Sequence, residues 1–273
     1  MRVIIGAGKV STVISRSADV ILPHSCIEVR NPNSIMQQLK KFAGKNISVI
    51  NTASKINLEW CEENKTEAYD VNTTGAINVA KVCKELDFHL VHISSGCIFD
   101  GGESEKVYTE EDMPSPAAWY TKTKVDADKG ILDLGYKKFT IVRPRQLISS
   151  LPYATNMITK FVSLGKGKFI TSKNSLTCIE DMGDMIDCLI GGGHYGIYNL
   201  ANTGYISPYE IALKIKELNP SLVVEKIDYD DYVKTLAVRR VNTLLDVSKL
   251  MSLGYVPRDA KTALDWCIQN YGK

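Results

Sequence analysis

Tyr120 and Lys124 are the pair of residues in this sequence whose types and spacing most directly suggest chemistry. Four residues apart on a helix, they lie on one face about one turn from each other and can reach the same small ligand. Ser95 follows an apolar, strand-like run from Phe88 to Ile93, and an open α/β sheet places its active-site groups at the ends of its strands. We therefore predict that the three side chains meet at one site.

The three residue types suit proton transfer at a carbonyl group. A free tyrosine has a pKa of about 10, and a neighbouring ammonium favours the phenolate. We therefore expect Lys124 to lower the pKa of Tyr120, which would supply the proton. Ser95 would hydrogen-bond the carbonyl and hold it beside Tyr120.

The elements that position these residues alternate along the first half of the chain. Arg2 to Ile5 predicts a short buried strand, and Gly6-Ala-Gly-Lys-Val-Ser11 follows as a glycine-rich turn into a helix. Strand and helix patterns continue to about residue 145, where regular alternation ends. We predict an α/β fold: a Rossmann-type doubly wound parallel sheet in residues 1–145. Residues 146–273 form mainly a smaller C-terminal α/β substrate domain, with some segments returning to the first.

Composition excludes several other classes of protein. The 273 residues are 44% apolar with a formal net charge of +2, which allows a full core. No Lys/Arg stripe suggests nucleic acid, and no apolar run approaches the roughly 20 residues that span a membrane. The seven cysteines are scattered without a Cys-x-x-Cys pair, so we expect no disulfide framework and no metal site. A cytoplasmic protein with reduced thiols is expected.

Six further segments carry a family resemblance that recurs in order through both halves of the chain: Asn57-Leu-Glu-Trp-Cys-Glu-Glu-Asn, Gly96-Cys-Ile-Phe, Thr121-Lys-Thr-Lys, Asn156-Met-Ile-Thr-Lys, Asn174-Ser-Leu-Thr and Gly196-Ile-Tyr-Asn. With the Ser, Tyr and Lys above, the chain resembles the extended short-chain dehydrogenase/reductases. Within them it is similar to the nucleotide-rhamnose epimerase-reductases of plants and large viruses, which are relatives of bacterial dTDP-4-dehydrorhamnose reductase.

The resemblance implies a nicotinamide cofactor. Relative to the family, the glycine-rich loop is one residue short and Ser11 replaces the third glycine. No acidic residue closes the second predicted strand, Asp19 to Leu22, which favours NADP(H), with NAD(H) as the alternative. The residues that the resemblance assigns to the cofactor are Gly6, Gly8, Lys9, Val10, Asn51, Ala53, Asn72, Tyr120, Lys124 and Arg143.

The resemblance also implies a UDP- or dTDP-linked sugar substrate. Ser95, Asn156 and Arg240 match positions that contact the substrate, and the permanently charged guanidinium suits a diphosphate. In the epimerase-reductases, a cysteine at the position of Cys97 pairs with a base matched by Lys160 to move protons beside the keto group. Catalytic roles are thus assigned to Ser95, Cys97, Tyr120, Lys124 and Lys160.

The predicted function is conversion of a nucleotide-4-keto-6-deoxyglucose to a nucleotide-L-rhamnose by 3,5-epimerisation and 4-reduction. Three alternatives remain: a 4-keto reductase alone, a different nucleotide-hexose reductase, and a non-catalytic subunit like the β-type regulatory subunit of methionine adenosyltransferase. In the family, the helix that begins near Val71 and the Tyr120 helix from two subunits form a four-helix bundle, so the resemblance implies a homodimer.

Overall fold

Short buried apolar runs, such as Val3-Ile4-Ile5, form the parallel six-stranded sheet at the centre of the protein. The computed structural model describes residues 1–102 and 105–273. The strand order is β10-β6-β4-β3-β1-β2. The strands are β1 (Arg2–Ile5), β2 (Val20–Leu22), β3 (Ser48–Asn51), β4 (His89–Ile93), β6 (Phe139–Pro144) and β10 (Gly196–Leu200). Because β1 lies between β2 and β3, the winding direction reverses there, where such sheets bind ligands.

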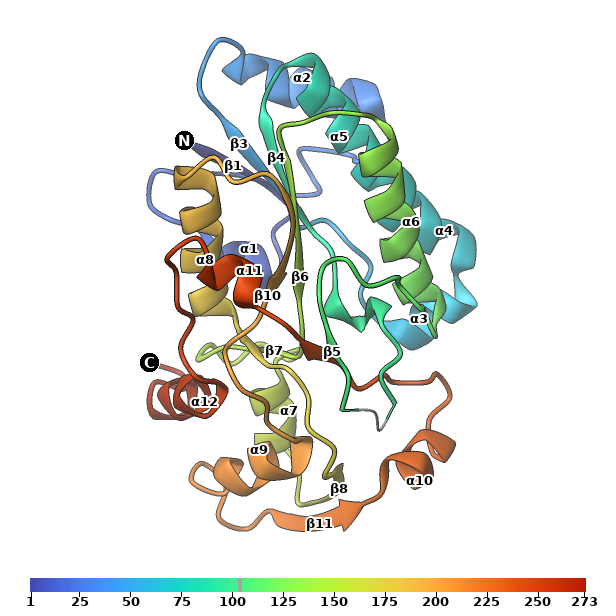
Figure 1. Ribbon diagram of the computed structural model, residues 1–273, viewed down its shortest axis with the longest axis vertical. Helices are drawn as coiled ribbons and strands as arrows, with labels where there is room; N and C mark the ends of the chain where they lie inside the picture. The colour runs from blue at the N-terminus through green and yellow to red at the C-terminus, as the bar shows by residue number, and fades with distance from the viewer. Residues whose placement is uncertain (103–104) are drawn as a thin grey trace.

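Helices cover both faces of this sheet (Figure 1). One side carries α2 (Pro32–Leu39), η1 (Lys40–Phe42), α3 (Leu58–Glu63), α4 (Lys65–Tyr69), η2 (Asp70–Thr74), α5 (Gly75–Glu85) and α6 (Trp119–Asp133). The other carries α1 (Lys9–Ile14), α8 (Ile179–Gly191) and α11 (Ser248–Met251). Each face has its own apolar cluster, with Ile131 of α6 buried in one and Ile186 of α8 in the other. The predicted Rossmann-type doubly wound sheet is therefore confirmed.

Helix α8 and strand β10 continue the alternation beyond residue 145. Strand β10 pairs in parallel with β6, with Gly196 opposite Thr140. Helix α8 and β10 are segments of residues 146–273 that return to the first domain, as the sequence allowed, although the expected end of regular alternation near residue 145 does not hold for this stretch. Its apolar residues are buried on the sheet, as Met185 and Leu200 show.

A smaller lobe lies beyond the carboxyl ends of the central strands (Figure 1). It contains β7 (Leu147–Ile148), α7 (Met157–Val162), β8 (Lys166–Ile170), β9 (Thr177–Cys178), α9 (Pro208–Ile215), β11 (Val223–Ile227), α10 (Tyr229–Lys234) and α12 (Ala260–Gln269). Its core includes Ile158, Ile211 and Leu264. Small parallel sheets join β11 to β8 and β7 to β9.

A third small sheet joins distant parts of the chain. Strand β12 (Leu244–Leu245) returns from the C-terminal part to pair with β5 (Val107–Tyr108). The short helix η3 (Gly96–Ile98) lies beside it, because Ile98 and Leu245 share an apolar cluster. Within residues 1–102 and 105–273, every helix is too short or too polar to cross a membrane.

Candidate active site

A cavity of about 780 Å³ lies between the carboxyl ends of the central strands and the smaller lobe. The structure brings all five predicted catalytic residues to its wall: Ser95, Cys97, Tyr120, Lys124 and Lys160. Strand β4 and the turn after it supply Ser95 and Cys97, α6 supplies the tyrosine and lysine, and α7 supplies Lys160. The cavity is large enough for a drug-sized ligand.

Ser95 and Tyr120 both lie in the cavity wall, where their side chains are close enough to hydrogen-bond. The Ser95 oxygen accepts a hydrogen bond from the Cys97 amide at 3.1 Å, which orients its side chain at the start of η3. Burial raises the pKa of Tyr120, and hydrogen bonding to Ser95 and the charge of Arg145 partly oppose that rise. The prediction that this pKa is lowered is wrong, because burial outweighs the contacts that favour the phenolate.

Lys124 lies beneath the cavity and is 1% exposed. Its ammonium donates to the Ile93 carbonyl at 2.8 Å, and Asp128 follows one turn later on α6. Burial lowers the pKa of Lys124 to about 8, while the Asp128 charge acts in the opposite direction. A lysine held this way presents a fixed donor at the end of β4.

Arg143 is not brought to the cavity, although the sequence assigned it to the cofactor. Its guanidinium is buried and pairs with Asp128 at 3.3 Å. It also lies over the Phe99 ring, 5.7 Å from the ring centre. In the structure, Arg143 therefore balances the carboxylate behind Lys124.

Cys97 has an unexpected partner in Arg145, which follows β6. The Arg145 guanidinium donates to Cys97 Sγ at 3.1 Å, and it also donates to the Val241 carbonyl. Lys160 lines the same cavity but is not a hydrogen-bond partner of Cys97 among the described residues. Burial lowers the pKa of Lys9 to about 8, and the Lys160 charge acts in the same direction. Backbone hydrogen bonding and the contact with Arg240 lower the pKa of Glu59, with a smaller contribution from the Lys160 charge.

The glycine-rich loop can admit a phosphate-bearing cofactor. Gly6 has φ +105°, and a Cβ there would meet Thr52 Oγ1 at 2.5 Å, so only glycine fits. A Cβ on Gly8 would meet nothing within 4 Å, which leaves open space against the backbone. Gly8, Lys9 and Val10 line the cavity, as expected for a loop that holds a pyrophosphate.

Three residues assigned to the cofactor act from behind the cavity wall. The Asn72 side chain accepts from the Lys55 amide at 2.7 Å and from the Ser54 hydroxyl at 3.0 Å. Asn51 accepts from the Ala53 amide at 3.2 Å. None of Asn51, Ala53 and Asn72 is among the cavity-lining residues of the described chain; Thr52 and Ser54 line the cavity instead.

The two residues assigned to the nucleotide behave differently. Asn156 is fully buried, caps α7 and donates to the Ser149 and Leu151 carbonyls at 2.7 and 2.9 Å. Its amide is thus occupied by backbone, which argues against the predicted substrate contact. Arg240 does line the cavity and pairs with Glu59 at 2.5 Å.

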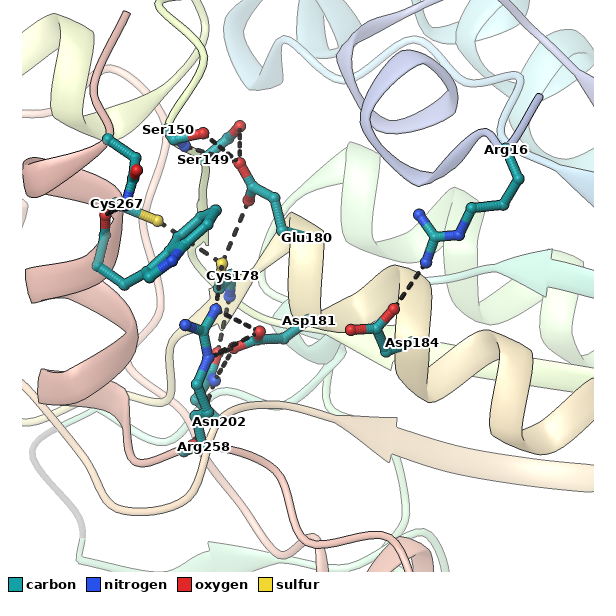
Figure 2. A network of polar contacts seen from close by, with 12 residues as sticks. Arg16, Ser149, Ser150, Cys178, Glu180, Asp181, Asp184, Asn202, Arg258 and Cys267 are labelled. Atoms are coloured by element: carbon teal, nitrogen blue, oxygen red, sulfur yellow. Dashed lines mark hydrogen bonds and ion pairs between the residues drawn. The ribbon is translucent and has the colours of Figure 1, made fainter. Parts of the chain in front are cut away.

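One group of metal-ligating side chains occurs in the described chain, away from the cavity. Cys178, Glu180 and Cys267 place their ligand atoms within 4.8 Å of one another. Arg258 lies 3.8 Å from Cys178 Sγ and pairs with Asp181 (Figure 2). A guanidinium so close opposes a bound cation, so this network serves to join the start of α8 to α12.

Arg145 is a site residue that sequence reasoning missed, whereas Thr52 and Ser54 belong to the segment Asn51-Thr-Ala-Ser that the resemblance places against the cofactor ribose. Arg145 directly follows β6, and Thr52 and Ser54 lie in the segment after β3. The rule that parallel sheets bind ligands at their carboxyl edge would have selected all three. Glu59 was also missed, and nothing in its sequence position indicates a contact with Arg240.

Comparisons with known proteins identify the family and the fold. The sequence model of the RmlD substrate binding domain family matches residues 6–273. The bifunctional dTDP-4-dehydrorhamnose 3,5-epimerase/dTDP-4-dehydrorhamnose reductase of Arabidopsis thaliana is 29% identical over 202 residues, which cover 71% of this chain and 66% of that protein. Three longer Arabidopsis relatives match over 30% to 33% of their length. The match thus spans less than two thirds of each of these four relatives.

Two further proteins match over most of their length. The dTDP-4-dehydrorhamnose reductase of Aggregatibacter actinomycetemcomitans is 27% identical over 267 residues, 89% of this chain and 87% of that protein. The solved structure of dTDP-4-dehydrorhamnose reductase from Bacillus anthracis, in complex with NADP, has a TM-score of 0.86 at 23% identity. It covers 98% of both chains and shows the same fold.

Proposed function

Because the chain belongs to the RmlD substrate-binding domain family, we propose that it is an NADP(H)-dependent reductase of a nucleotide-linked 4-keto-6-deoxy sugar. The observation that carries this proposal is the facing pair of Ser95 and Tyr120 in the cavity wall, with Lys124 fixed beneath them. A serine, a tyrosine and a buried lysine at the carboxyl edge of a parallel sheet suit carbonyl reduction. A non-catalytic subunit would not require these three side chains to converge.

Each residue has a role that its position supports. Ser95 hydrogen-bonds the sugar carbonyl and holds it beside Tyr120. Tyr120 gives its proton to the developing alkoxide, which requires the protonated phenol that burial favours. Lys124 and the open backbone at Gly8 would hold the nicotinamide cofactor, which supplies the hydride when bound.

Epimerisation at C3 and C5 is the finer part of the proposal. Cys97 and Lys160 line the same cavity as the reducing residues, and the Arabidopsis relative is named for both activities. Protons beside a ketone can exchange when the enolate is stabilised, and Cys97 and Lys160 would transfer them. Arg145, donating to Cys97 Sγ at 3.1 Å, adds a fixed positive charge beside that enolate.

Reduction without epimerisation is the second candidate function. The observation in its favour is that Cys97 Sγ bonds to Arg145, whose guanidinium stays protonated and cannot act as a base. In that case Cys97 would only position Arg145.

A homodimer and a preference for NADPH complete the proposal. Helices α5 and α6 pack side by side on one face of the sheet (Figure 1), and Leu132 near the end of α6 is 43% exposed. These two helices would form the four-helix bundle that the resemblance implies, and light scattering would report the mass of the assembly.

The preference for NADPH rests on the second strand. It ends at Leu22 and is followed by Pro23, with no carboxylate to hold an unphosphorylated ribose.

The experiment that tests the function is incubation of the purified protein with UDP- and dTDP-4-keto-6-deoxyglucose plus NADPH or NADH. We expect NADPH oxidation with one or both sugars and a 6-deoxyhexose product identified by NMR. A rhamnose product supports epimerisation plus reduction, whereas reduction only of a sugar already epimerised supports the second candidate. Absence of NADPH oxidation with every keto sugar would overturn the proposal.

A further inference from the structure

Cys178 and Cys267 bring two sulfur atoms into contact from distant parts of the chain. Their Sγ atoms lie 3.6 Å apart, although the two residues are 89 positions apart in the sequence. Cys178 ends β9 and Cys267 lies in α12 (Figure 2), and both side chains are fully buried. In residues 1–102 and 105–273, which hold all seven cysteines, no other two thiols hydrogen-bond each other. The contact is therefore particular to this pair.

The hydrogen bonds around the sulfurs give the two thiols different roles. Cys178 Sγ donates to Glu180 Oε2 at 3.2 Å, so the hydrogen between the two sulfurs comes from Cys267. Hydrogen bonding to Cys178, together with burial, raises the pKa of the Cys267 thiol. Cys267 therefore keeps its proton, while Cys178 can pass its own to the carboxylate.

Glu180 is held in place as the proton acceptor. Its Oε1 atom accepts from the Ser149 hydroxyl and from the Ser150 amide and hydroxyl, each at 2.8 Å. These three donors all go to one oxygen, which leaves Oε2 to the Cys178 thiol. A carboxylate fixed beside a thiol in this way is a suitable base for it.

Arg258 covers the pair on the solvent side. Its Nη2 atom lies 3.8 Å from Cys178 Sγ, and its side chain is 34% exposed and pairs with Asp181. The positive charge favours a thiolate, which is the reactive form of cysteine. The same charge opposes a metal ion, the other ligand that two sulfurs and a carboxylate could bind. Movement of this one partly exposed side chain would open Cys178 to a small solute.

We propose that Cys178 and Cys267 form an oxidisable dithiol, which hydrogen peroxide converts to a disulfide that ties β9 to α12. The Cys178 thiolate attacks a peroxide oxygen, the O–O bond breaks, and hydroxide leaves as water with the proton held by Glu180, so that Cys178 becomes a sulfenic acid. The Cys267 sulfur then attacks the Cys178 sulfur, the S–O bond breaks, and the hydroxyl leaves as water with the Cys267 proton. The two thiols lose two electrons and two protons, which convert one hydrogen peroxide to two waters.

The new bond requires a short movement and has a predictable effect. The sulfurs must close from 3.6 Å to about 2.05 Å. Because the crosslink joins positions 89 apart, it restricts the unfolded chain more than the folded protein, and oxidation should raise the melting temperature. Neither cysteine is among the described residues that line the cavity, so the inference is independent of the proposed function.

Disulfide mapping of the purified full chain tests the proposal. Wild type, Cys178→Ala, Cys267→Ala and the control Cys83→Ala are treated with hydrogen peroxide, quenched with catalase and alkylated while unfolded. Cys83 is a matched control, because it is buried like the pair but has no sulfur partner among the described residues. Digestion without reduction and mass spectrometry then identify linked peptides. We expect a peptide pair joined through Cys178 and Cys267 in wild type and in Cys83→Ala.

Thermal unfolding is the second readout. Peroxide should raise the Tm of wild type and of Cys83→Ala by about 5 °C or more, and dithiothreitol should reverse the rise. Neither change should occur in Cys178→Ala or Cys267→Ala, which each lack one of the two sulfurs. Mapping in wild type needs no variant, so the test stays valid if either of these variants folds poorly.

Three results would overturn the proposal. The first is full alkylation of Cys178 and Cys267 after a treatment that oxidises the exposed Cys26. The second is a disulfide that joins either residue of the pair to another cysteine. The third is a metal ion bound by these sulfurs in the untreated protein, as detected by native mass spectrometry of wild type and Cys178→Ala.

Discussion

The Arg145 guanidinium donates a hydrogen bond to Cys97 Sγ at 3.1 Å, and its charge also acts on Tyr120. One side chain thus connects the residue proposed for epimerisation with the residue proposed for reduction. Neither connection follows from the distance along the chain, because Arg145 lies 48 residues after Cys97. The relationship makes Arg145 the most informative residue of the site to change.

Arg145→Met should therefore impair both activities. We expect kcat/KM for the keto sugar to fall about tenfold or more, because a buried charged donor is lost and the pKa of Tyr120 rises further. Arg145→Lys keeps the positive charge but loses the several N–H donors of the guanidinium. Its kcat/KM should therefore lie between those of Arg145→Met and wild type. Steady-state NADPH oxidation provides the measurement. Equal rates for Arg145→Met and wild type would show that Arg145 only supports the Val241 backbone.

Tyr120→Phe removes the proposed proton donor and little else. We expect reduction of the keto sugar to slow by about a hundredfold or more, with NADP⁺ affinity within about threefold of wild type. Single-turnover NADPH oxidation and calorimetry measure the two quantities. If the variant keeps more than about a tenth of the wild-type rate, Tyr120 is not the acid.

Cys97→Ala and Lys160→Ala separate epimerisation from reduction. We expect each variant to stop deuterium from D2O entering C3 or C5 of the bound keto sugar, as followed by NMR. Reduction of a sugar that is already epimerised should continue in both, because Ser95, Tyr120 and Lys124 are unchanged. Deuterium uptake at the wild-type rate in both variants would show that Cys97 and Lys160 do not transfer these protons.

Lys124→Met should stabilise the unligated protein at neutral pH. The pKa of Lys124 is about 8 in the folded state against an ordinary 10.5, so below pH 8 the folded protein carries a buried charge at full cost. Between pH 8 and 10.5 the unfolded chain binds more protons, and wild-type stability rises with pH. We expect the variant to gain about 1–3 kcal/mol in free energy of unfolding at pH 7, with the gain shrinking toward pH 10.5.

Urea unfolding of wild type and Lys124→Met at pH 7, 8.5 and 10 measures this difference. The variant should be inactive throughout, so stability and activity change in opposite directions. A gain that stays constant with pH would mean that burial of the charge is not its source.

Asn156→Ala and Arg240→Met distinguish a structural residue from a binding residue. Asn156→Ala leaves two buried carbonyls unpaired and uncaps α7, so we expect a loss of about 2–4 kcal/mol in stability. Arg240→Met breaks only the partly exposed pair with Glu59, which should change stability by less than about 1 kcal/mol. It should, however, weaken UDP or dTDP about tenfold, since a guanidinium facing the cavity is lost. The reverse pattern would restore Asn156 as the nucleotide contact.

Local patterns predicted the positions of Ser95, Tyr120 and Lys124 correctly, because strand ends and helix faces are properties of short segments. Cys97 and Lys160 were assigned to the site only through the family resemblance, and the structure places both in the cavity wall. The direction of a side chain within an element depends on what packs against that element. Arg143 and Asn156 therefore proved to bond within the protein, while Arg145, two residues after Arg143, faces the cavity.

The fold, like the site, was predictable where local patterns decide it and not where distant segments meet. The alternation of strands and helices predicted the parallel sheet, yet α8 was missed although its buried face is apolar. Its helical pattern follows the short strands and turns of the smaller lobe, so nothing local shows that it returns to the central sheet. Its packing against Ile4, Ile50 and Val91 of the sheet, together with the pairing of β10 with β6, places it there.

That pairing has a consequence for synthesis of the protein. Strand β6 ends at Pro144, but its outer neighbour β10 is completed only at Leu200. While the ribosome produces the intervening residues, β6 presents an unpaired hydrogen-bonding edge, which can pair with another nascent chain. A fragment ending at residue 145 would keep that edge permanently. The part of the smaller lobe from β7 to β9 is therefore an insertion that delays completion of the sheet, and chaperone protection would matter most during this interval.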